Sequence, residues 1–123
     1  MKIDHIVFYG TLMSMGMTKM HEKIKSDLVY EGNCILYGKL YTLGRYPGLK
    51  SGNYLIHGEL YKILNTDLLN ILDEYEAVDN ENPLTAGFTR KSVVLVEPKK
   101  KAWVYYYEGD VSEKNLLKTN FWK

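Results

Sequence analysis

The sequence predicts an α+β fold in which strands predominate. Segments rich in β-branched and aromatic residues recur along the chain, and only two segments have the apolar spacing of helices. The strands do not alternate regularly with helices, as they would in a parallel α/β sheet. The pattern gives about five or six strands and two short helices. A chain of 123 residues suits one hydrophobic core, so we expect a single domain over residues 1–123.

The first half of the chain predicts a buried strand, a short helix and a long strand region. Ile3–Tyr9 is apolar and rich in β-branched and aromatic residues, which indicates a strand. Methionines at helical spacing predict a short amphipathic helix within Met13–Ile24. Leu28–Leu43 contains few helix formers and favours strand. Three glycines and a proline predict a loop over Gly44–Gly52.

The second half predicts another strand, one clear helix and a hairpin. Tyr54–Ile63 has the composition of a strand. Thr66–Tyr75 places its leucines on one face and begins with residues that can cap a helix. Asp79–Gly87 is polar, contains a proline and predicts a loop. Phe88–Glu97 and Ala102–Tyr107 predict two strands of a hairpin with lysines at its turn.

Charge balance and cysteine count narrow the classes of function. Sixteen Lys and Arg residues against fifteen Asp and Glu give a formal net charge of +1, which argues against general electrostatic binding to nucleic acid or anionic membranes. The single cysteine, Cys34, cannot form an internal disulfide and fits a reducing compartment. The N-terminus lacks the pattern of a signal peptide, and no stretch approaches the roughly 20 apolar residues that span a bilayer. We therefore expect a cytoplasmic protein that does not bind membranes or metal.

The segment Tyr9-Gly10-Thr11-Leu12 is the first candidate site. Here a strand ends in a glycine, which permits close approach of a ligand to the backbone. If a helix follows, successive backbone N–H groups point outward and can bind a carboxylate or phosphate. On spacing alone, an ordinary turn between a strand and a helix is the favoured interpretation.

Two further places carry charged candidates. Asp73 and Glu76 lie three residues apart near the end of the predicted helix, on nearly one face. The negative end of the helix dipole would raise the proton affinity of Glu76, which suits a general base. On these residues alone, a solvated acidic helix end is the favoured interpretation. Arg90 opens a predicted strand and is a candidate to hold a substrate carboxylate or to form a structural ion pair.

Taken in order, the short motifs of the chain resemble one known family. The motifs are Tyr9-Gly10-Thr11-Leu12, Gly38-Lys39-Leu40-Tyr41, Gly58-Glu59-Leu60-Tyr61, Leu72-Asp73-Glu74-Tyr75-Glu76, Phe88-Thr89-Arg90 and Ala102-Trp103-Val104-Tyr105. This series is similar to the γ-glutamylcyclotransferase-like superfamily, in particular its γ-glutamylamine cyclotransferase branch. The resemblance spans about Ile3 to Tyr107, and the tail over residues 109–123 is left unassigned.

The resemblance implies a fold, a reaction and a set of site residues. The fold would be a mixed α+β structure built around a curved, barrel-like sheet. The backbone amides of Tyr9, Gly10, Thr11 and Leu12 would bind the γ-glutamyl part of a small-molecule substrate. Glu76 would act as general acid and base, with Asp73, Phe88 and Arg90 as supporting residues. The α-amine of the substrate would attack its own side-chain carbonyl, forming 5-oxoproline and releasing an amine without any cofactor. The oligomeric state is left between monomer and weak dimer.

Two alternatives stay open. Family members commonly have glycine after the catalytic Glu and a tyrosine two residues before the arginine, whereas this chain has Ala77 and Phe88. A member that binds a small ligand without turnover is therefore the second hypothesis. Lys99–Lys101 with the following aromatic residues could also form a nucleic-acid stacking surface. A solvated turn before a strand is the simpler interpretation, and the near-neutral charge favours it.

Overall fold

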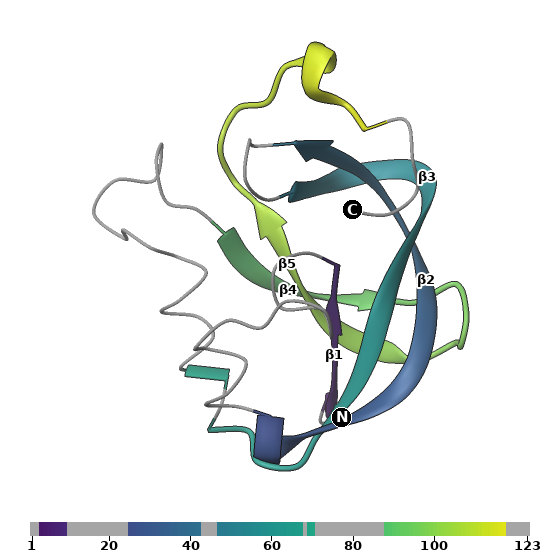
Figure 1. Cartoon of the computed structure of the whole chain (residues 1–123), viewed down its shortest axis with the longest axis vertical. Helices are drawn as coiled ribbons and strands as arrows, with labels where there is room; N and C mark the ends of the chain where they lie inside the picture. Colours follow the sequence, from purple (N-terminus) through teal and green to yellow (C-terminus); the bar gives the residue numbers. More distant parts are fainter. Residues whose placement is uncertain (1–2, 10–24, 43–46, 68, 71–87, 118–123) are drawn as a thin grey trace.

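The computed structural model describes residues 3–9, 25–42, 47–67, 69–70 and 88–117. These residues form one five-stranded mixed sheet with the strand order β2-β3-β1-β5-β4 (Figure 1). The strands are β1 (His5–Phe8), β2 (Leu28–Thr42), β3 (Pro47–Ile63), β4 (Phe88–Val94) and β5 (Lys101–Tyr107). Two short 3-10 helices, η1 (Lys25–Asp27) and η2 (Glu113–Asn115), accompany them.

The predicted α+β class with two or more helices is wrong for this part of the chain. Strands dominate the described ranges, which hold no helix of seven or more residues, and the sheet is open. The predicted helix in Met13–Ile24 lies outside the described residues. Of Thr66–Tyr75, residues 66–67 form a turn, residues 69–70 are helical, and residues 68 and 71–75 lie outside.

The predicted loop Gly44–Gly52 is wrong in its second half. Its second half belongs to β3, which pairs antiparallel with β2 from Leu28↔Ile63 to Thr42↔Pro47. Cross-strand packing overrides the loop preference of glycine and proline here, because β-propensity depends strongly on context. A Cβ on Gly52 would lie 2.4 Å from the Lys39 side chain. The glycine therefore lets the paired strands β2 and β3 lie close together where their register shifts.

The central strand β1 separates two hydrophobic clusters. It pairs antiparallel with β3 and parallel with β5, and all four of its residues are buried. The cluster on the Phe8 face contains Ile6, Phe8, Leu28, Tyr61, Ile63, Leu69 and Tyr105, with Trp103 packed against it. The cluster on the Val7 face contains Val7, Tyr9, Cys34, Leu36, Leu40, Leu49, Ile56, Leu60, Leu95, Ala102 and Val104. Both faces of the sheet are therefore covered, and the sheet bends around the Val7 face.

The outer edge of β2 is met at two places by later parts of the chain. The amide of Ile35 donates to the carbonyl of Glu97, and the amide of Val96 donates to the carbonyl of Ile35, both at 2.8 Å. Figure 1 shows the turn between β4 and β5 lying beside β2 at this point. Farther along, the amide of Leu117 donates to the carbonyl of Leu40 at 2.8 Å. The tail that sequence patterns left unassigned is thus joined to the sheet.

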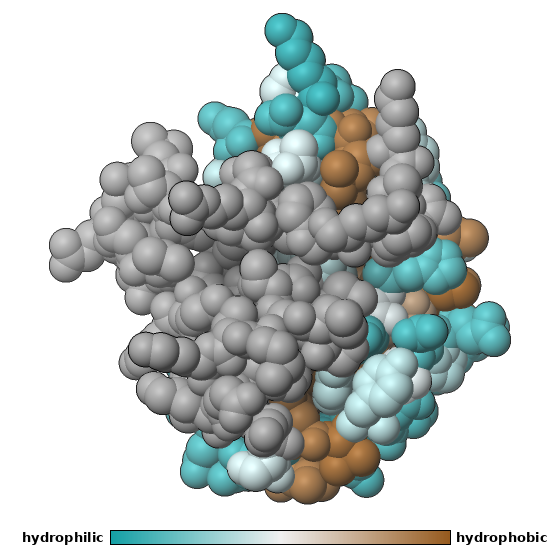
Figure 2. Space-filling view, in the orientation of Figure 1, coloured by the Kyte–Doolittle hydropathy of each residue, from teal (hydrophilic) through white to brown (hydrophobic). Residues whose placement is uncertain are grey.

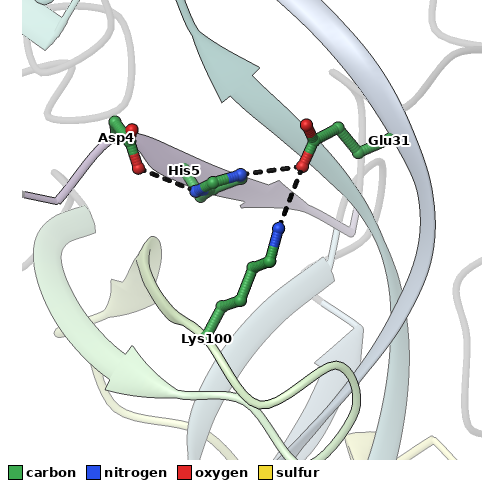
Figure 3. A network of polar contacts seen from close by, with 4 residues as sticks. All are labelled: Asp4, His5, Glu31 and Lys100. Atoms are coloured by element: carbon green, nitrogen blue, oxygen red, sulfur yellow. Dashed lines mark hydrogen bonds and ion pairs between the residues drawn. The ribbon is translucent and has the colours of Figure 1, made fainter.

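A polar network links β1, β2 and the turn after β4 (Figure 3). The imidazole of His5 lies between two carboxylates: Nδ1 is 2.9 Å from Oδ1 of Asp4, and Nε2 is 2.7 Å from Oε1 of Glu31. Nζ of Lys100 lies 3.5 Å from the same Glu31 oxygen. The hydrogen bond from His5 is the main reason why the pKa of Glu31 is lowered. The network fixes one end of the sheet by charge-assisted contacts.

In the described ranges, no helix has the length and apolar character needed to cross a membrane. Hydrophobic residues nevertheless reach the surface among hydrophilic ones, as Figure 2 shows. The large apolar side chains that are most exposed are Val94, Leu64, Tyr37, Tyr30, Tyr54, Val29 and Leu55.

Candidate functional site

Only part of the predicted site can be placed. The side chains of Tyr9 and Arg90 are described, and Phe88 is described as the first residue of β4. The other predicted residues, Gly10, Thr11, Leu12, Asp73 and Glu76, lie outside the described residues. What the structure defines is the framework at the end of β1, from which the chain continues into Gly10.

Tyr9 anchors the end of β1 through its hydroxyl group. The side chain is 6% exposed on the Val7 face, donates a hydrogen bond to the backbone carbonyl of Tyr105 at 2.5 Å, and accepts one from the backbone amide of Leu49 at 3.3 Å. One phenol therefore connects β1 to both β5 and β3. Because the hydroxyl is used internally, the contribution of Tyr9 to a site must come from its backbone and from the position that the anchor imposes.

A buried carboxylate lies on the Phe8 face at the same level of the sheet. Glu59 of β3 is directly opposite Phe8 of β1, so both side chains lie on one face. Glu59 is 9% exposed and accepts a hydrogen bond from the hydroxyl of Tyr61 at 3.1 Å. Burial, followed by the charge of Glu59, raises the pKa of Tyr61, which keeps this hydroxyl protonated as a donor.

Sequence reasoning quoted Glu59 within a motif but gave it no role. The available signal was a glutamate between apolar residues at an inward-facing position of a predicted strand. The glycine before it has a steric role: a Cβ on Gly58 would lie 2.7 Å from Cγ1 of Val7 and 3.2 Å from the carbonyl oxygen of Phe8. Gly58 therefore lets β3 lie close against β1 where Glu59 is presented.

Arg90 lies on the opposite side of β1 from Glu59, at the same level along the strands. Ile6 is opposite Trp103 in the parallel pairing of β1 and β5, which puts Phe8 beside Tyr105. Arg90 of β4 is opposite Tyr105, and therefore also lies on the Phe8 face. Its guanidinium carbon is 4.3 Å from the centroid of the Trp103 ring, which is a cation–π contact. The stacking holds the guanidinium against the sheet, and Nε1 of Trp103 is buried without a hydrogen-bond partner.

The arrangement places opposite charges on either side of the strand that carries the predicted loop. Glu59 and Arg90 are three strand spacings apart, about 14 Å along the sheet. Within the described ranges, no three His, Cys, Asp or Glu side chains gather to hold a metal ion.

Cys34 is a packed residue of β2. It is 1% exposed in the cluster on the Val7 face. Burial raises the pKa of its thiol to about 12, so almost no thiolate is present at neutral pH. A cysteine nucleophile is therefore not part of this framework.

Comparisons with known proteins agree with the motif series. A sequence model of the family described as "Gamma-glutamyl cyclotransferase, AIG2-like" matches residues 6–123. The gamma-glutamylcyclotransferase family protein YtfP of Escherichia coli is 33% identical over 84 residues, which cover 68% of this chain and 66% of that protein. A putative gamma-glutamylcyclotransferase of Vibrio cholerae is 31% identical over 121 residues, covering 98% of this chain and 96% of the relative.

The fold itself is also shared with a solved structure. The solution NMR structure of E. coli ytfP matches with a TM-score of 0.64 and 23% sequence identity, covering 95% of this chain and 92% of that one. At that identity the likeness establishes the arrangement of the chain and nothing about its chemistry.

Proposed function

Because the chain belongs to the gamma-glutamyl cyclotransferase, AIG2-like family, we propose that it is a cyclotransferase that converts a small γ-glutamyl amide into 5-oxoproline and a free amine. The observation that carries this proposal is the family match over residues 6–123, which includes both the Tyr9–Leu12 segment and Glu76. In this proposal, residues 1–123 act as one domain and need no cofactor.

The proposed reaction is intramolecular. The α-amine of the glutamyl group attacks its own side-chain carbonyl carbon, a C–N bond closes the five-membered lactam, and the C–N bond to the leaving amine breaks. Glu76 removes a proton from the attacking amine and returns it to the leaving amine, so atoms and charge balance. Since nucleophile and electrophile belong to one molecule, correct orientation alone can lower the barrier by about 7 kcal/mol or more.

The described framework supports this arrangement. The Tyr9 hydroxyl anchors the strand that leads into Gly10-Thr11-Leu12, whose backbone amides are proposed to bind the γ-glutamyl group and its developing oxyanion. Arg90, stacked on Trp103, is a candidate to hold the glutamyl carboxylate as a supporting residue. Asp73 and Phe88 are the other supporting residues that we propose.

Turnover by the purified full-length chain tests the proposal. The chain would be incubated with γ-glutamyl amino acids, γ-glutamyl-ε-lysine and γ-glutamyl alkylamides while 5-oxoproline is measured. Replacing Glu76 by Gln is expected to lower kcat/KM by on the order of 10²-fold or more. Glu74→Gln is the matched control, because the helical spacing predicts that Glu74 points elsewhere. Equal activity of Glu76→Gln and the unchanged chain would remove the proposed base.

A second function is favoured by two residues. Ala77 and Phe88 stand where the family pattern has glycine and tyrosine, and these changes suit a member that binds a γ-glutamyl compound without turnover. Saturable binding of 5-oxoproline or a γ-glutamyl amide, with no 5-oxoproline formed by a concentrated sample, would select this second function over catalysis.

A further inference from the structure

The two edges of the open sheet meet at one point and then separate. The bridge between Ile35 of β2 and residues 96–97 joins them, whereas β4 itself pairs only with β5 in the described part of the chain. Beyond the bridge, the diverging edges leave a cleft of about 300 Å³, which we name the seam. The seam is lined by Leu36, Tyr37, Ser51, Gly52, Val93, Val94 and Tyr106.

The backbone of β4 presents peptide groups toward the seam. The amide of Leu95 donates to Lys100 on the β5 side at 2.9 Å, whereas the amide of Val96 donates to β2. Peptide groups alternate in direction along a strand, so those of Ser92 and Val94 point away from β5, toward the seam. An exposed strand edge of this kind is a template for pairing with another extended chain.

The side chains at the seam favour a partly apolar occupant. Val94 is 65% exposed and Tyr37 is 57% exposed, although both are large apolar or aromatic residues. Val93 lies deeper and packs against the cluster on the Val7 face. Burial raises the pKa of Tyr106, so its hydroxyl is neutral and can donate or accept a hydrogen bond. Apolar side chains of an added strand would cover this surface.

Two lysines lie beside residues that line the seam: the side chain of Lys39 packs against Gly52, and Lys50 directly precedes Ser51. Lys39 and Lys50 are directly opposite each other in the pairing of β2 and β3, an arrangement that is unfavourable for like charges. Their ammonium groups lie over tyrosine rings, 5.8 Å from the centroid of Tyr54 and 5.4 Å from that of Tyr107. No described residue forms an ion pair with either lysine.

A third lysine adds to this charge on the β4 side. Nζ of Lys91 is 5.5 Å from the centroid of Tyr106, which lines the seam, and 3.2 Å from Oε1 of Glu108. The carboxylate of Glu108 thus forms an ion pair with Lys91 and also lies within electrostatic reach of Lys50, whereas neither Lys39 nor Lys50 has an ion-pair partner among the described residues. Three lysines thus stand against one carboxylate among these described residues, which favours an anionic occupant.

We propose that the seam binds an extended segment of a partner protein in which acidic and apolar residues alternate. The segment would pair its backbone with the edge of β4 that no described strand pairs, place its apolar side chains against Tyr37 and Val94, and direct its carboxylates toward Lys39 and Lys50. This binding mode is the addition of a strand to a sheet, in which the backbone supplies affinity and alternate side chains supply specificity. It does not depend on the proposed cyclotransferase reaction.

Three synthetic peptides test the proposal against the full-length chain. The first is acetyl-Glu-Val-Glu-Val-Glu-Val-amide, the second has Lys in place of each Glu, and the third is the acidic peptide with N-methylated valines, which cannot pair as a strand on that edge. Titration calorimetry at low salt is expected to give binding of the first peptide at least tenfold tighter than of the other two. No binding of the acidic peptide, or equal binding of all three, would overturn the proposal.

Two double variants distinguish the effect of the two lysines beside the seam on peptide binding from the effect of the protein's net charge. Lys39→Gln with Lys50→Gln is expected to weaken binding of the acidic peptide about tenfold, as expected for two cation contacts of modest strength. Lys62→Gln with Lys99→Gln makes the same change in net charge at exposed positions that do not line the seam, and should alter binding less than twofold. Equal weakening in both variants would mean nonspecific attraction and would end the proposal.

Hydrogen exchange locates the peptide and provides a readout independent of affinity. Bound acidic peptide should slow exchange at the amides of Ser92 and Val94 by at least tenfold. Binding without slower exchange at these two amides contradicts strand addition at β4. Concentration-dependent self-association that protects the same amides without peptide would show that a second copy, not a partner segment, occupies the seam.

Discussion

Replacing Tyr9 by phenylalanine should lower the free energy of unfolding by about 2–3 kcal/mol. The substitution keeps the ring and removes only the hydroxyl, which bonds the Tyr105 carbonyl at 2.5 Å and the Leu49 amide at 3.3 Å. A buried polar group left without its partner costs about 1–3 kcal/mol, and the longer bond to Leu49 contributes the smaller share. The two losses together give the expected range.

Urea unfolding followed by circular dichroism measures this effect. With an m-value of about 1.5 kcal/mol/M, a loss of 2–3 kcal/mol lowers the midpoint by roughly 1.3–2 M. Tyr37→Phe is the matched control, since it removes the same hydroxyl from a side chain that is 57% exposed. The control should stay within about 0.5 kcal/mol of the unchanged chain. If Tyr9→Phe also stays within that margin at an unchanged m-value, the reasoning about the anchor is refuted.

Three further outcomes are expected. Gly58→Ala places a methyl group 2.7 Å from Cγ1 of Val7, so overpacking of about 1–3 kcal/mol should lower the melting temperature by roughly 4–12 °C; an unchanged temperature would contradict this. The hydrogen bond from His5 lowers the pKa of Glu31, so its stabilisation is present above the ordinary value of 4.5 and is lost as pH falls through the lower folded value. The stability difference between the unchanged chain and Glu31→Gln in urea unfolding should therefore shrink in acid, and a constant difference would refute the linkage. Cys34, with its pKa raised from 9.0 to about 12, should react with iodoacetamide at pH 8 at least 10²-fold more slowly in the folded chain than in urea, and equal rates would exclude the buried thiol.

Strand composition predicted most of the sheet but not its pairing. The expected strand Ile3–Tyr9 is confirmed as β1, and the expected hairpin of Phe88–Glu97 and Ala102–Tyr107 is confirmed as β4 and β5 with shorter bounds. The start of β3 at Pro47 was missed, because the strand conformation around Gly52 depends on close pairing with β2 and not on local sequence preference. Periodicity alone also cannot show which strands become neighbours.

The candidate site was predictable to a smaller extent. Arg90 was singled out as a strand residue, and the structure adds its stacking on Trp103, which depends on a pairing between distant segments. Glu59 was missed as a functional candidate, since its burial beside Phe8 follows from the sheet order. The roles given to Tyr9–Leu12 and Glu76 stay predictions for the enzyme assay to decide.

The position of β1 has a consequence for how the protein is made. Of the described strands, β1 is synthesised first, yet it lies in the middle of the sheet between β3 and β5, and Ile6 pairs with Trp103 about one hundred positions later. β1 can pair with β3 once Ile63 has been made, but neither hydrophobic cluster can close until β5 has also been synthesised, so one edge of β1 stays unpaired until then. Such dependence on distant contacts slows folding, and it makes the molecule sensitive to anything that captures its first few residues during translation.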